Sequence, residues 1–124
     1  MRNSLVAASA ACALAAPALA VETSNFNLAT TGDLVALCAA QPDEPLYGQA
    51  LQFCYGYMAG MAQFHRALVQ AHDIEPLACP QHEVTREALV QVFLDWARGK
   101  PGAMADLPAD SVKRATVAAW PCGG

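Results

Sequence analysis

After residue 30, apolar side chains recur at intervals of three to four positions in four separate stretches. This spacing is typical of helices that bury one face and expose the other. The four stretches cover residues 32–40, 45–72, 85–99 and 108–120. Alternating apolar and polar runs and Asn-Gly or Asp-Gly hairpin turns, which indicate β-strands, do not occur between them. The pattern therefore predicts an all-α fold, a small four-helix bundle.

Capping residues and prolines set the expected boundaries of these helices. Either Thr30 or Thr31 can cap the first helix, and Thr85 can cap the third. Pro45 and Pro108 suit the first turn of the second and fourth helices, where the missing N–H group costs nothing. The second helix is the longest and is expected to be the spine of the domain.

Gly56 and Gly60 lie well inside the second helix, where each costs roughly 1 kcal/mol relative to alanine. We expect another backbone to approach closely at these positions. Aromatic residues in the second and third helices, including Phe93 and Trp96, are interpreted as core residues. The buried stripe predicted for the second helix contains Leu46, Ala50, Phe53, Tyr57, Gly60, Met61, Phe64, Leu68 and Ala71.

The first 20 residues have the pattern of a secretory signal peptide, with Arg2, an apolar run over 5–16 and an Ala-Leu-Ala site. We expect cleavage after Ala20, a flexible lead-in over 21–30 and one domain over 31–124, placed in the periplasm. A retained membrane anchor is disfavoured because the apolar run is shorter than the roughly 20 residues of a spanning helix. A lipoprotein leader with Cys12 as the lipidated residue lacks the leucine usual three positions upstream.

Cleavage would remove Cys12 and leave four cysteines, an even number typical of a disulfide framework in a small exported domain. Three pairings are open. The proline turn makes the first two helices antiparallel neighbours, which brings Cys38 toward Cys54. Cys79 and Cys122 both lie beside prolines outside the helices. We therefore favour the pairs Cys38–Cys54 and Cys79–Cys122.

Charge and reactive side chains exclude several function classes. Without Arg2 the chain has six Lys and Arg against eleven Asp and Glu, which disfavours nucleic acids and anionic membranes as partners. His65, His72 and His82 lack a free thiol as partner if the cysteines are cross-linked, and Cys79 has no set of zinc ligands around it. No phosphate-binding or dinucleotide motif is present. We predict a protein that is not an enzyme and has no metal or cofactor.

Residues 53–60, Phe-Cys-Tyr-Gly-Tyr-Met-Ala-Gly, form the most specific motif. They resemble the Phe-Cys-x-Gly-Tyr-x-x-Gly segment of the Rap/Tai family, the immunity proteins of type VI secretion amidase effectors. The resemblance continues in order through Asp-Leu-x-x-x-Cys at 33–38, Cys-Pro at 79–80, Leu-Pro at 107–108 and Trp-Pro-Cys at 120–122. The matching motif positions are Phe53, Cys54, Gly56, Tyr57 and Gly60.

This resemblance implies a periplasmic protein that binds a peptidoglycan amidase and occludes its active site, and it implies homodimers. By analogy, the loop over 100–107 is the candidate contact, with Lys100, Met104, Asp106 and Leu107 as candidate partner-binding residues and Met104 as the side chain that would enter an apolar groove. A plain connector is the alternative for this loop. The alternative function is a periplasmic binding module or acid-stress chaperone without a toxin partner.

Overall fold

The structure is a computed structural model that describes residues 20–123. The predicted signal peptide lies outside the described residues except for Ala20. Within them the chain forms no strand, and the all-α prediction is confirmed. The four α-helices are α1 (Thr31–Cys38), α2 (Tyr47–Gln70), α3 (Arg86–Arg98) and α4 (Pro108–Ala119), and two short 3-10 helices are η1 (Thr23–Asn27) and η2 (Pro101–Ala103). None of the helices in this part of the chain is long and apolar enough to span a bilayer.

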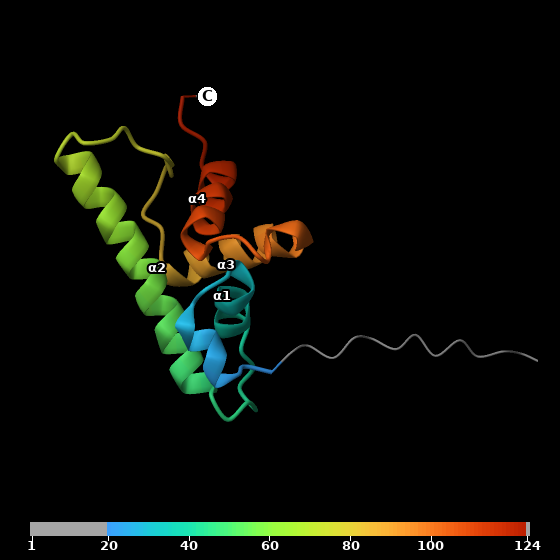
Figure 1. Ribbon diagram of the computed structural model, residues 1–124. Coiled ribbons are helices and arrows are strands. Elements are labelled where there is room, and N and C mark those ends of the chain that lie inside the picture. The colour runs from blue at the N-terminus through green and yellow to red at the C-terminus, as the bar shows by residue number, and fades with distance from the viewer. Residues whose placement is uncertain (1–19, 124) are drawn as a thin grey trace, which may run out of the picture.

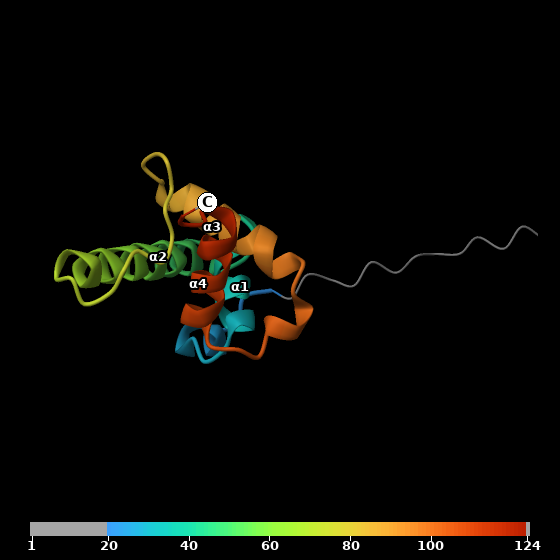
Figure 2. The same ribbon diagram turned by 90° about the horizontal axis from the view of Figure 1, so that it is seen from above.

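Helix α2 has 24 residues and is about 36 Å long at the usual rise per residue. Helices α1 and α3 pack against it, and α4 packs against α3 and α1. Figures 1 and 2 show the C-terminal half of α2 extending away from these helices, with the chain returning beside it before α3 begins. The bundle is therefore compact at one end of α2 and open at the other.

The core lies where α1, α3 and α4 meet the N-terminal half of α2. Phe93 of α3 is its largest fully buried side chain, and Leu34 of α1 and Met58 of α2 are also fully buried. The other buried members of this cluster are Cys38, Cys54, Leu89, Val90, Ala97, Val112 and Ala115. A domain of this size hides only about two-thirds of its unfolded surface, so cross-links between its elements contribute usefully to stability.

The stripe predicted for α2 is wrong in its details. Ala50 is buried as predicted, but the other buried residues of this helix are Cys54 and Met58, one position away from the predicted Phe53 and Tyr57. Phe53 is 37% exposed and Phe64 is 66% exposed. The reason is that Cys54 faces α1 and fixes the orientation of the helix, and that the second half of α2 leaves the core.

Residues 21–30, expected to be a flexible lead-in, contain η1 and are tied to the domain. The backbone N–H of Val21 donates to the Glu44 carboxylate over 2.8 Å. The Asn25 amide donates to Asp33 over 3.0 Å. Asp33 in turn accepts from the N–H of Thr30, and Thr30 caps α1 in a reciprocal capping box. The pKa of Asp33 is lowered, mainly by the Asn25 hydrogen bond.

Two disulfides cross-link the bundle, and they are the two pairs favoured by the cysteine positions in the sequence. Cys38–Cys54 joins α1 to α2 with the Cα atoms 5.2 Å apart. Cys79–Cys122 joins the segment between α2 and α3 to the C-terminal residues, with a Cα distance of 5.0 Å. Disulfides persist in oxidising compartments, which is where this domain is expected to be stable.

Candidate functional site

The loop over 100–107 lies against the N-terminal end of α1. The N–H of Gly32 donates to the Met104 carbonyl over 2.9 Å, and the N–H of Thr31 donates to the Asp106 carbonyl over 2.8 Å. These two N–H groups belong to the first turn of α1, where a helix has no partners of its own for them. The loop thus satisfies the helix end and is held in one position by it.

Buried hydroxyl groups strengthen this attachment. Thr31 Oγ1 lies 3.0 Å from the Asp106 carbonyl and 2.7 Å from Ser111 Oγ. Both Thr31 and Ser111 are fully buried, and they are the buried polar residues of the described chain. Because a buried hydroxyl without a partner is costly, this pair favours one arrangement of α1, the loop and α4.

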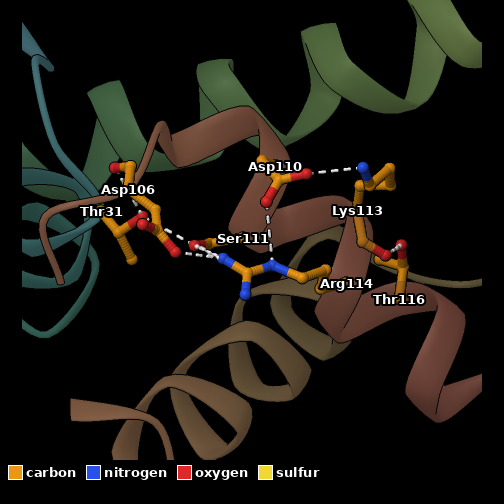
Figure 3. Close-up of polar contacts among 7 residues, drawn as sticks. All are labelled: Thr31, Asp106, Asp110, Ser111, Lys113, Arg114 and Thr116. Carbon is orange, nitrogen blue, oxygen red and sulfur yellow. Dashed lines mark hydrogen bonds and ion pairs between the residues drawn. The ribbon is translucent and has the colours of Figure 1, made fainter. Parts of the chain in front are cut away.

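Arg114 of α4 connects the loop to the outer surface of that helix (Figure 3). Its guanidinium pairs with the Asp106 carboxylate, and Nε lies 2.9 Å from Asp110 Oδ2 in an ion-pair contact without hydrogen-bond geometry. The Arg114 guanidinium also lies over the Trp96 ring, 5.1 Å from the ring centroid. Lys113 binds Asp110 from the other side over 2.5 Å, and this hydrogen bond is the main reason that the pKa of Asp110 is lowered.

The four candidate partner-binding residues have different environments. Met104 is partly buried and packs against the core, so it does not project as the sequence suggested. The Asp106 carbonyl accepts hydrogen bonds from Thr31, and the Asp106 carboxylate pairs with Arg114. Lys100 is exposed, and Leu107 is 70% exposed, the largest value among the large hydrophobic residues of the described chain. The large apolar side chain that this loop exposes is therefore Leu107.

The motif residues of α2 also have mixed environments. Cys54 is in a disulfide, and burial raises the pKa of the partly buried Tyr57. Phe53 packs edge-on against Phe26, with ring centroids 5.5 Å apart. A Cβ atom added at Gly56 or Gly60 would meet nothing within 4 Å. Within the described residues no other backbone approaches these glycines, which differs from the sequence prediction.

A cleft of about 590 Å³ lies beside the C-terminal half of α2. Its other walls are residues 76–85, the start of α3 and the end of α4, and its lining is mostly apolar. The wall over 76–85 is held in place by three contacts. The N–H of Leu77 donates to His65 Nε2 over 3.0 Å, the N–H of Cys79 donates to the Trp120 carbonyl over 2.8 Å, and the Cys79–Cys122 disulfide anchors the same point.

Sequence reasoning did not predict this cleft. Two histidines line it, His65 half-buried on α2 and His82 exposed in the segment before α3. Helical spacing gave no signal for it, because Phe64, Leu68 and Ala71 continue the predicted apolar stripe in the second half of α2.

The reactive side chains of the described residues are placed as follows. The four cysteines from Cys38 onward are all in disulfides, so none of them is a thiol nucleophile in this state. No group of three or more His, Cys, Asp or Glu side chains in the described range is placed to hold a metal ion. What the surface offers is a rigid loop with an exposed leucine and a separate apolar cleft.

The sequence is similar to that of a known protein family. Residues 30–122 match the family described as Rap1a immunity proteins. The chain belongs to this family. The Rap1a match begins at the N-cap of α1 and ends at Cys122, so it includes all four α-helices and both disulfides. No curated protein and no solved structure matches the chain. Membership in the Rap1a family confirms the resemblance seen in the sequence and indicates an immunity protein against a secreted effector.

Proposed function

We propose that this Rap1a protein acts in the periplasm, where it binds a peptidoglycan amidase delivered by type VI secretion and occludes the active site. The observation that carries this proposal is the loop over 100–107. It presents Leu107 at 70% exposure on a base fixed to α1 and α4. A preorganised loop loses little conformational entropy on binding, which favours tight association.

Coexpression with a panel of type VI amidase effectors exported to the periplasm tests the proposal. The protein should prevent lysis by at least one effector and bind it at submicromolar concentration. Leu107→Asp should weaken that binding roughly 30-fold, because burying a leucine contributes about 2 kcal/mol. Val117→Asp is the matched control, since Val117 is exposed on α4 and lies outside the loop. Lysis unaffected by the protein, or equal binding by both variants, would contradict the proposal.

The protein also forms a homodimer under this proposal, and the exposed face of α2 supports it. No charged residue occurs between Tyr47 and Phe64. On the outer face the order Phe53, Gly56, Gly60, Phe64 is nearly symmetric about its centre. An antiparallel second copy would place glycine against glycine and phenylalanine against phenylalanine, as an isologous interface requires.

Light scattering of the purified protein tests the dimer. Gly60→Glu should give monomers while keeping the helix, because glutamate has a better helix propensity than glycine. Ala118→Glu introduces the same charge on an exposed position of α4 and should stay dimeric. A monomeric parent protein, or a dimeric Gly60→Glu variant, would refute this interface.

A further inference from the structure

The cleft beside α2 shares no residue with the loop over 100–107. Its floor reaches the core at Met58, Leu89 and Val112, each less than 10% exposed. Leu77 stands at its edge and is 46% exposed. Its volume of about 590 Å³ lies within the range of ligand-binding sites, which are commonly apolar with a few polar groups at their edges.

The charge of the cleft is opposite to that of the chain. The whole chain has a formal net charge of −4. The cleft is lined by Arg66 of α2, Arg86 of α3 and Lys113 of α4, against the single carboxylate of Glu83. His65 and His82 also line it and bring no negative charge. An acidic protein thus has a basic rim around an apolar cleft.

These cations are available to a partner. Lys113 and Arg86 form ion pairs with exposed carboxylates on their own helices, Asp110 and Glu87, and Arg86 also lies over the Tyr55 ring, 4.5 Å from its centroid. Exposed pairs of this kind contribute little and exchange readily with other anions. Arg66 forms no ion pair with any residue in 20–123.

We propose that the cleft binds an extended segment of a partner protein in which acidic side chains lie beside apolar ones. The apolar side chains enter the cleft against Met58 and Leu89. The carboxylates meet the cations on the rim. A protein segment fits better than a small anion with a single head group, because the cations come from three different helices. This surface acts independently of Leu107, so either contact can exist without the other.

Titration of the ¹⁵N-labelled protein with acetyl-Leu-Glu-Leu-Glu-Leu-amide tests the proposal by NMR. We expect shifts confined to the residues that line the cleft, including the Trp120 indole. The matched peptide acetyl-Leu-Lys-Leu-Lys-Leu-amide should bind at least about tenfold more weakly, because its charges repel the rim. Raising the salt concentration should weaken, and not strengthen, binding of the Glu peptide.

Two charge-reversal variants locate the effect. Arg66→Glu should weaken binding of the Glu peptide at least about fivefold and strengthen binding of the Lys peptide. Arg98→Glu carries the same charge change on an exposed residue of α3 outside the cleft, and it should bind as the parent does. Shifts spread over the surface, equal binding of both peptides, or equal loss in both variants would overturn the proposal. Loss of peptide binding by Arg66→Glu with unchanged amidase binding would separate this site from the proposed immunity contact.

Discussion

Replacing Thr31 by valine is the sharpest test of how the loop over 100–107 is held. Valine keeps the size of the threonine side chain, so no cavity forms and only the hydroxyl is lost. That hydroxyl is fully buried, 2.7 Å from Ser111 Oγ and 3.0 Å from the Asp106 carbonyl. The Asp106 carbonyl keeps the Thr31 N–H as a donor, whereas Ser111 keeps only a 3.5 Å contact with Arg114.

The magnitude follows from these contacts. Two neutral hydrogen bonds contribute about 1 kcal/mol each, and leaving the Ser111 hydroxyl buried without a good partner adds up to about 1 kcal/mol. We expect Thr31→Val to lower the free energy of unfolding by about 2–3 kcal/mol. In a domain of roughly 100 residues this corresponds to a decrease in Tm of about 10–20 °C.

A double-mutant cycle with Ser111→Ala isolates the hydroxyl pair. In a protein that already carries one of the two substitutions, the other should lower the free energy of unfolding by about 1 kcal/mol less than it does in the parent. Urea unfolding followed by circular dichroism measures all four proteins, and an unchanged m value shows that the unfolded state is the same. A Thr31→Val variant within about 0.5 kcal/mol of the parent, or strictly additive effects, would refute the reasoning.

Three further predictions concern the rest of the domain. The pKa of Asp33 is lowered, so its contribution to stability is present above its unfolded pKa and is lost as the pH falls through the folded value. Acid titrations of unfolding should therefore show that Asp33→Asn loses less stability than the parent between about pH 5 and pH 2. Replacing both Cys79 and Cys122 by alanine should lower the free energy of unfolding by about 4 kcal/mol, because the bond closes a loop with a sequence separation of 43; an unchanged urea midpoint would contradict this. Phe93→Ala should cost about 3–5 kcal/mol, since Phe93 is fully buried, while Phe64→Ala at 66% exposure should change the stability of the monomer by less than about 0.5 kcal/mol; similar losses would mean that the burial is misassigned.

The helices and the cross-links were predictable because local signals determine them. Thr30 and Thr85 cap α1 and α3 as expected, and Pro108 opens α4. The positions of Cys38 and Cys54 on antiparallel neighbours favoured the observed bond. These features depend on residues close in sequence or on short connections, so spacing and capping rules are sufficient to predict them.

The rotation of α2 and the positions of the site residues were not predictable in the same way. A stripe through Phe53, Tyr57 and Phe64 and a stripe through Ala50, Cys54 and Met58 both fit helical spacing. Packing against α1 decides between them. Met104 looked exposed because it lies in a loop, but Gly32 and the core hold it. The cleft depends on where the segment over 76–85 runs, which only the tertiary structure shows.

The two disulfides differ in how reachable they are. Cys38 and Cys54 are 6% and 0% exposed, whereas Cys79 is partly exposed and Cys122 is exposed. Thiol–disulfide exchange requires an attacking thiolate to reach sulfur, so a mild reductant should open the outer bond first. The product would retain its α1–α2 cross-link while the wall of the cleft near Leu77 came loose from the C-terminus. Changes in redox conditions would therefore act on one surface of this protein well before they reached its interior.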